Sequence, residues 1–159
     1  MMAITPPVAG QEISASGWGI PISNLVNTLE ARAVTHYVAV LGSPATFNTG
    51  AAVPILTIAM PATPAGTKLD ISFTMYANSG PLGHGGGFIN ADVNGTDVSP
   101  TVVIPDIIAL ASWSGRVVNV SPPVNVAYNV RLKIAKYQAG GGIVAQTTNT
   151  NLCVVAYRP

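Results

Sequence analysis

Charged side chains are scarce in this sequence. Lysine, arginine, aspartate and glutamate make up 8% of the 159 residues, and their net charge at pH 7 is +1. An ordinary soluble domain contains about 25% charged residues. Phosphate binding needs clustered basic residues, and the densest group here is Arg131, Lys133 and Lys136. We interpret it as a solvated strand face and expect no nucleic-acid partner. A surface so poor in charge suits a subunit that packs against copies of itself or in a larger assembly.

Cysteine and long apolar runs are missing as well. Cys153 is the only cysteine, which excludes an internal disulfide framework and a cysteine-based zinc site. It lies in a strand-like run, where we expect a buried, inert thiol. No apolar run approaches the ~20 residues that a membrane span requires, so no membrane insertion is expected. The start MMAITPPVAGQEIS lacks the basic and continuous apolar regions of a secretory signal.

The residues of a hydrolase are incomplete. His84 and the three glycines after it spell the oxyanion loop of lipases and esterases. The G-x-S-x-G nucleophile turn is absent, and the other histidine, His36, precedes every candidate serine from Ser43 onward, which reverses the esterase order. We therefore interpret residues 79–87 as a loop whose glycines reach positive φ cheaply. The sequence predicts a protein that is not an enzyme and needs no cofactor.

A metal site is not expected either. Asp92, Asn94 and Asp97 could provide oxygen ligands for calcium. They surround the pair Asn94-Gly95, which is the favoured dipeptide for a tight hairpin turn. An ordinary turn with Asp and Asn chemistry is the preferred interpretation of these residues.

Apolar spacing near the N-terminus predicts a short helix. The first 13 residues show no periodicity and contain prolines, so we expect an extended arm over residues 1–19. A heptad-like seam follows, made by Trp18, Ile22, Leu25 and Leu29. The predicted helix spans residues 20–32 and is too short to be stable alone in water. Its seam packs either on its own domain or, in the interpretation we prefer, against the same helix of neighbouring subunits.

From about residue 34 the period of the apolar residues changes from 3.6 to 2. The segments 69–76 and 125–137 alternate strictly, as half-buried antiparallel strands do. Further strands are expected at 35–42, 53–60, 87–93, 97–104, 115–120, 142–146 and 151–157. Prolines cluster at the ends of these runs, where they terminate strands and protect edges. Residues 33–159 are thus predicted to form an all-β domain, a jelly roll or β-sandwich of about eight or nine antiparallel strands.

Sugar binding is the alternative to a purely structural role. Saccharides stack on exposed aromatic rings. Trp113 lies between two predicted strands, and Tyr76 ends a strand beside the 79–87 loop. If both are exposed, they could form a stacking patch with His84 or Asn78 as hydrogen-bonding partners. The competing interpretation is that Trp113 covers one end of the barrel or fills a subunit interface.

The layout of the chain resembles small virion proteins of tailed bacteriophages, particularly those of actinobacterial hosts. Residues 2–32 carry most of the resemblance, with a Pro-rich anchor, a Trp-Gly turn and an Asn/Leu-rich helix. The segments 61–77 and 149–159 look like strands of the trimeric jelly-roll knobs of phage fibres and of tumour-necrosis-factor-like domains.

The resemblance implies a homotrimeric structural protein of the virion, such as a capsid decoration protein, a head fibre or a minor tail protein. Its N-terminal arm would bind a phage capsid or tail protein, and its knob could also bind a host-surface glycan. The helix seam would be buried on the three-fold axis. The anchoring residues implied in the arm are Ile4, Pro6, Pro7, Val8 and Ile13.

Overall fold

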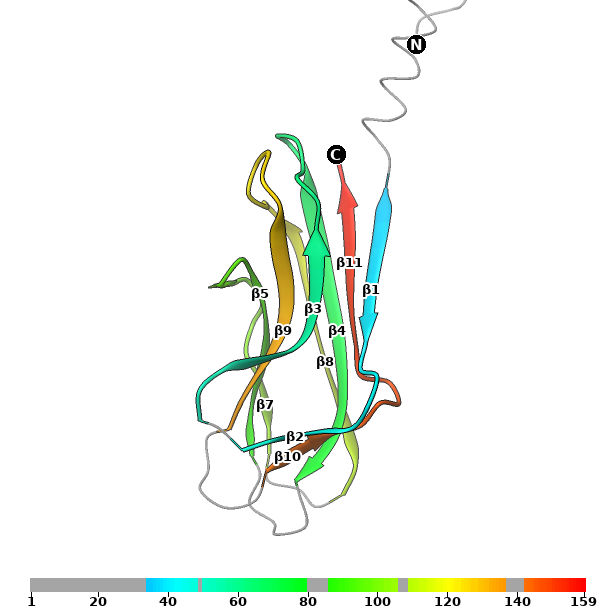
Figure 1. Cartoon of the computed structure of the whole chain (residues 1–159), viewed down its shortest axis with the longest axis vertical. Helices are drawn as coiled ribbons and strands as arrows, with labels where there is room; N and C mark the ends of the chain where they lie inside the picture. Colours follow the sequence, from blue (N-terminus) through cyan, green and yellow to red (C-terminus); the bar gives the residue numbers. More distant parts are fainter. Residues whose placement is uncertain (1–33, 49, 80–85, 106–108, 137–141) are drawn as a thin grey trace, which may run out of the picture. The chain divides into compact units, whose positions relative to one another are not determined.

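The computed structural model of the chain describes residues 34–48, 50–79, 86–105, 109–136 and 142–159 (Figure 1). These residues form one compact unit that begins at Val34. Within these ranges there are eleven strands and no helix, all pairings between the strands are antiparallel, and the strands make two sheets. The predicted all-β class is confirmed. The predicted arm and helix, with all their anchoring and seam residues, lie outside the described residues.

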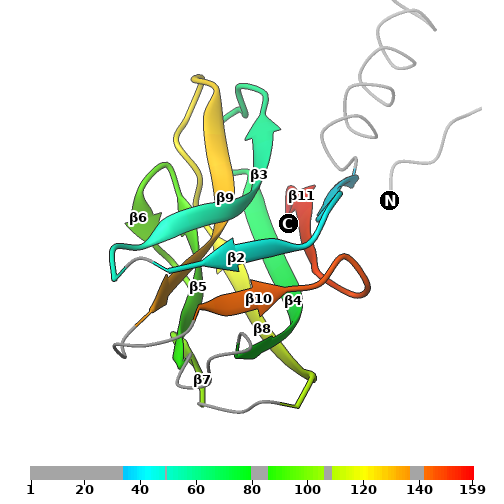
Figure 2. The same cartoon turned by 60° about the horizontal axis from the view of Figure 1, so that its bottom comes forward.

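Sheet A is organised around the longest strand, β4. On one side β4 pairs first with β11, which is followed by β1, and farther along with β10, which is followed by β2. On its other side β4 pairs with β8. Figure 2 shows β10 beside β2 where they cross the end of the domain. The strands of sheet A are β1 (Thr35–Val40), β2 (Ala45–Phe47), β4 (Lys68–Ser79), β8 (Ala111–Val120), β10 (Ile143–Ala145) and β11 (Asn151–Tyr157).

Sheet B forms the second layer. Its central strands are β9 and β5, with β3 along the outer side of β9 and the short β6 and β7 along the other side of β5. The strands of sheet B are β3 (Val53–Met60), β5 (Gly87–Val93), β6 (Thr96–Asp97), β7 (Val102–Ile104) and β9 (Tyr128–Lys136).

The strand pairings are nested along the chain. β1 pairs with β11, β2 with β10, β3 with β9, β4 with β8 and β5 with β7. The outermost pair therefore joins the two ends of the described chain, and each inner pair joins strands closer in sequence. Because β3·β9 and β5·β7 lie in one sheet and β1·β11 and β4·β8 in the other, the domain is a long hairpin folded over itself into two layers.

The core lies between the two sheets and follows the predicted alternation. β4 buries Leu69, Ile71, Phe73 and Met75, which are at most 2% exposed, while the residues between them face outward. β9 contributes Val130, Leu132 and Ile134 from the opposite sheet. One face of each strand is thus removed from water, which supplies the main stabilisation of such a sandwich.

Several strand boundaries differ from the sequence prediction. The predicted strand 97–104 is two strands, β6 and β7, because Pro100 lies between them and cannot donate to a ladder. β2, a strand of three residues, is too short to show a period. Pro54 lies inside β3, at a sheet edge and next to an irregularity in the pairing. The hairpin turn at Asn94-Gly95 is confirmed, with φ of 51° and 96°, as two-residue β-hairpins require.

Candidate functional site

The outer face of sheet A carries few charged side chains. The alternation that turns Leu69 and Ile71 inward turns Asp70, Ser72, Thr74 and Tyr76 of β4 outward. Residues paired across two antiparallel strands point to the same side of the sheet. The register therefore adds Cys153 and Val155 of β11, Val38 and Val40 of β1, and Ser112, Ser114 and Arg116 of β8 to this face.

Two exposed valines on β1 and a third just before it lie along this face, with the exposed His36 between Val34 and Val38. Val34, Val38 and Val40 are 55%, 64% and 66% exposed. We call them the β1 valine row. Val38 pairs with Cys153 on the neighbouring β11, so the row continues onto half-buried apolar side chains. Apolar residues scattered singly on a surface are ordinary, whereas a contiguous apolar patch marks an interaction site.

Two of the charged groups on this face, Asp70 and Arg116, pair with each other, while Lys68 donates a hydrogen bond to the Ser121 hydroxyl. Asp70 accepts hydrogen bonds from the backbone N–H of Asn119 at 3.0 Å, from Arg116 at 3.2 Å and from the Tyr157 hydroxyl at 3.2 Å. The Asn119 N–H, followed by Tyr157 and Arg116, lowers the pKa of Asp70 below its ordinary value. Asp70 is thus a satisfied anion and adds little net charge to the face.

The outer face of sheet B carries the other described carboxylates. Asp92 on β5 is completely buried, and it accepts hydrogen bonds from Arg131 Nε at 3.0 Å and from the Gly95 backbone N–H at 2.9 Å. Lys133 bridges Asp92, at 3.5 Å, and Asp97. Every aspartate in the described part of the chain is therefore paired with a basic side chain.

The sequence prediction for this face was partly wrong. Arg131 and Lys133 do share a face, but the Lys133 side chain is only 14% exposed, because both cover the buried Asp92. The face is a set of ion pairs and not a freely solvated basic surface. Asp92 also holds the predicted turn, since it accepts the Gly95 N–H. Among the described residues no group of His, Cys, Asp and Glu side chains could hold a metal ion.

The structure does not bring the two candidate stacking residues together. Trp113 lies within β8, which begins earlier than predicted, and it pairs with the buried Met75. It therefore faces inward and packs against the core. Tyr76 pairs with Ser112 and lies on the opposite face of the same sheet, as does Asn78. His84 lies outside the described residues.

Cys153 is not buried as predicted. The alternation of β11 turns Leu152, Val154 and Ala156 into the core, so Cys153 lies half-buried on the outer face as a free thiol. His36 lies exposed on the same face, next to Val155 on β11. None of the described segments contains a helix with the length and apolar character needed to cross a membrane.

The chain shares its fold with part of a solved structure. No protein-family model and no curated protein matches the sequence. Dimeric latent PorU from Porphyromonas gingivalis aligns with 80% of this chain at 11% identity and a TM-score of 0.51. The alignment covers 13% of the PorU chain, so this protein spans only a small part of the length of that relative. The likeness shows a common β-sandwich fold.

Two further structural neighbours have lower scores. The vertex protein P5 of PRD1 aligns with 79% of this chain and 72% of its own at 16% identity, with a TM-score of 0.41. A family 35 carbohydrate-binding module from Clostridium thermocellum aligns with 76% and 97% at 14% identity, with a TM-score of 0.38. These scores are too low to support a functional inference.

Proposed function

We propose that this chain is a non-enzymatic structural protein of a bacteriophage virion. Its N-terminal arm binds a capsid or tail protein, and its described domain forms a homotrimeric jelly-roll knob. The observation that carries the proposal is the outer face of sheet A, which combines the exposed β1 valine row with few charged side chains, of which Asp70 and Arg116 are paired. Such a face is suited to contact with protein.

The nested pairings support a jelly roll. A jelly roll is a double-sheet arrangement of antiparallel strands built from Greek keys, and it is common in viral capsid and lectin domains. The order β1-β11-β4-β8 in one sheet and β3-β9-β5-β7 in the other is the order that a rolled long hairpin produces. The sequence pattern favours a jelly roll as well.

The β1 valine row supports self-association. Burying a valine side chain in an interface contributes about 1.5 kcal/mol. The three valines, beside Cys153 and Val155, therefore give a favourable centre for an interface with little desolvation of charge. A net charge of +1 on the whole chain gives identical subunits little electrostatic repulsion.

Attachment to particles tests the proposed role. We would produce phage particles in which the encoded chain lacks residues 2–13 and quantify it in purified virions by mass spectrometry. The shortened protein should remain an oligomer but be lost from the particles, because multivalent weak arms supply the attachment. A Val103→Ala variant, changed at an exposed position of β7, is the matched control and should attach normally. Full occupancy by the shortened protein would overturn the role assigned to the arm.

A further inference from the structure

A depression on the outer face of sheet B has the features of a ligand site. Its volume is about 370 Å³, and it is lined by Ala52, Phe88, Asn90, Asp97, Thr101 and Ala135. Asn90 and Ala135 are half-buried on adjacent strands, β5 and β9, and form its floor. The other four residues are exposed and form its rim.

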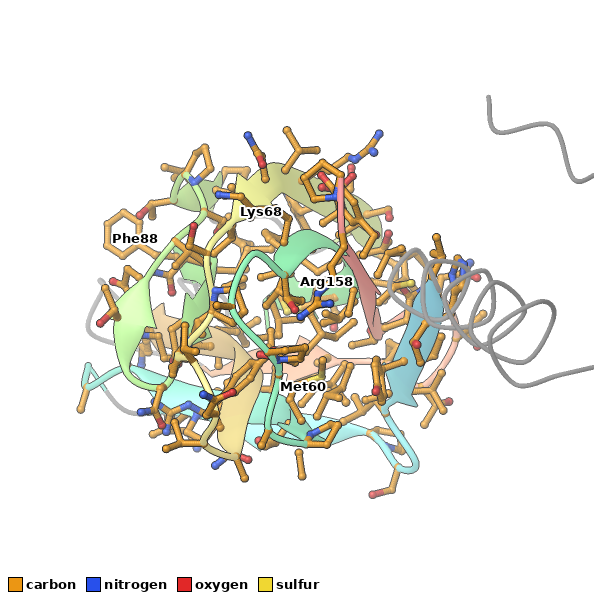
Figure 3. All side chains as sticks on the ribbon, turned by 90° about the horizontal axis from the view of Figure 1, so that it is seen from above. Met60, Lys68, Phe88 and Arg158 are labelled. Atoms are coloured by element: carbon orange, nitrogen blue, oxygen red, sulfur yellow. The ribbon has the colours of Figure 1, made fainter. Side chains whose placement is uncertain are left out.

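Phe88 provides an apolar platform at the rim. Its side chain is 38% exposed, and Figure 3 shows its ring at the periphery of the domain, directed away from the core. The backbone below it is fixed, because Phe88 pairs with Val103 of β7 on one side and Ala135 of β9 on the other. An aromatic ring held in this way can stack on a ligand at little entropic cost.

Asp97 provides a pre-organised acceptor across the depression. Lys133 donates to its carboxylate, and Asn90 donates as well, which together lower the pKa of Asp97. Asp97 is therefore an anion at neutral pH with a fixed orientation. More than half of its side chain is exposed, so it can still accept hydrogen bonds from a ligand. The Thr101 hydroxyl lies on the same rim and can donate or accept.

The charge around the depression is balanced. Asp92 and Asp97 are compensated by Arg131 and Lys133, which are all engaged in ion pairs with one another. These four groups therefore cancel one another and offer no net charge to attract a phosphate or a cation. A neutral ligand with one apolar face and a rim of hydroxyl groups fits its chemistry best.

We propose that this depression binds a neutral saccharide. The C–H face of a hexose ring would stack on Phe88, two neighbouring hydroxyls would donate to Asp97, and Asn90 and Thr101 would complete the polar contacts. The site differs from the stacking patch expected from the sequence. Trp113, a member of that expected patch, faces the core in the structure. The site is independent of the proposed virion role, because a purified protein can bind sugar whether or not it occurs in particles.

Saturation-transfer difference NMR on the full-length protein tests the proposal, because it detects weak, rapidly exchanging ligands. The probes are glucose, galactose, mannose and N-acetylglucosamine, with N-acetylneuraminic acid as the anionic comparison. A site of this size predicts a dissociation constant of about 1 mM for a monosaccharide. At least one neutral sugar should give a saturable signal, and Phe88→Ala and Asp97→Asn should each weaken its binding at least tenfold.

Two exposed variants serve as controls. Val103→Ala removes an apolar neighbour of Phe88 that does not line the depression, and Tyr76→Ala removes the aromatic candidate on the other sheet. Both should bind as the unchanged protein does. Asp97→Asn keeps the shape of the site, so a loss in this variant cannot come from misfolding of a truncated side chain. No signal with any neutral sugar, binding of the anionic sugar alone, or a signal lost in Tyr76→Ala but kept in Phe88→Ala would overturn the proposal.

Discussion

At the residue scale, Gly115 is the position where packing leaves the least room. It pairs with Phe73, whose ring occupies the space above the glycine inside the core. A Cβ at position 115 would lie 2.8 Å from Phe73 Cε1 and closer still to Cζ. An aromatic ring that covers a glycine on a neighbouring strand is a known way to stabilise a sheet. The glycine is therefore required by its neighbour.

We predict that Gly115→Ala destabilises the domain by about 2 kcal/mol, because the buried Phe73 ring must leave its position. Urea denaturation followed by tryptophan fluorescence measures the loss, since Trp113 packs against the same core. Gly42→Ala is the control. No atom lies within 4 Å of a Cβ at position 42 and its φ is not positive, so this change should leave stability equal or slightly higher. Equal effects of the two changes would contradict the packing described here.

Asp70 gives the domain a predictable response to acid. Its folded pKa is lower than its ordinary value near 3.8, first because of the Asn119 N–H and then because of Tyr157 and Arg116. The interaction therefore stabilises the fold above the unfolded pKa, and this stabilisation is lost as the pH falls through the folded pKa. We expect Asp70→Asn to lower stability by about 1 kcal/mol at pH 7 and to have a progressively smaller effect as the pH falls through the folded pKa of Asp70.

Unfolding in urea across this pH range measures the effect. Arg116→Gln removes one partner of Asp70 but keeps the Asn119 N–H, so its loss of stability should be the smaller of the two. An effect of Asp70→Asn that does not change between neutral and acid pH would show that its ionisation does not stabilise the fold.

At the scale of elements, Asp92 joins the β5–β6 hairpin to β9. It is fully buried, accepts the Gly95 N–H at the turn and pairs with Arg131 on the neighbouring strand. Removing one partner of a buried pair leaves charge and hydrogen-bonding groups without compensation. We therefore predict that Asp92→Ala costs about 3 kcal/mol of stability.

Asp97 supplies the matched comparison for this prediction. It pairs with Lys133 on the same face but is largely exposed, so Asp97→Ala should cost less than about 1 kcal/mol. Thermal unfolding of the two variants, measured side by side, gives the difference. Similar losses in both would mean that burial of Asp92 does not determine its contribution.

The elements also show what the sequence could and could not predict. The long strands were predictable, because the period of two in β4 and β9 reports directly which side chains face the core. The burial of Asp92 was not, because its outward position in β5 resembles that of any solvated carboxylate. Asp92 is buried because β5 pairs with β9 and places Arg131 beside it, and these two strands are distant in sequence. Trp113 was predicted to lie between two strands, because the small residues around it in β8 hide the period of that strand. The strand β2 was not predicted, because three residues define no period.

At the scale of the whole molecule, the β1 valine row is the expected centre of the subunit interface. Val38→Glu would place a charge in the middle of this row, where burial requires desolvation. We predict that the variant associates at least tenfold more weakly than the unchanged protein, as measured by sedimentation velocity over a range of concentrations. Thr57→Glu, at an exposed position of β3 on the other sheet, should leave association unchanged. A normal oligomer with Val38→Glu would exclude this face from the interface.

The solution mass of the full-length protein, determined by light scattering, tests the central claim most directly. The account predicts a homotrimer of about 49 kDa, three times the 16.2 kDa of one chain. The same measurement on residues 33–159 shows whether the domain holds itself together, in which case the mass remains that of a trimer, or whether the N-terminal segment is required. A monomer for the full-length protein at all concentrations would contradict the proposed assembly.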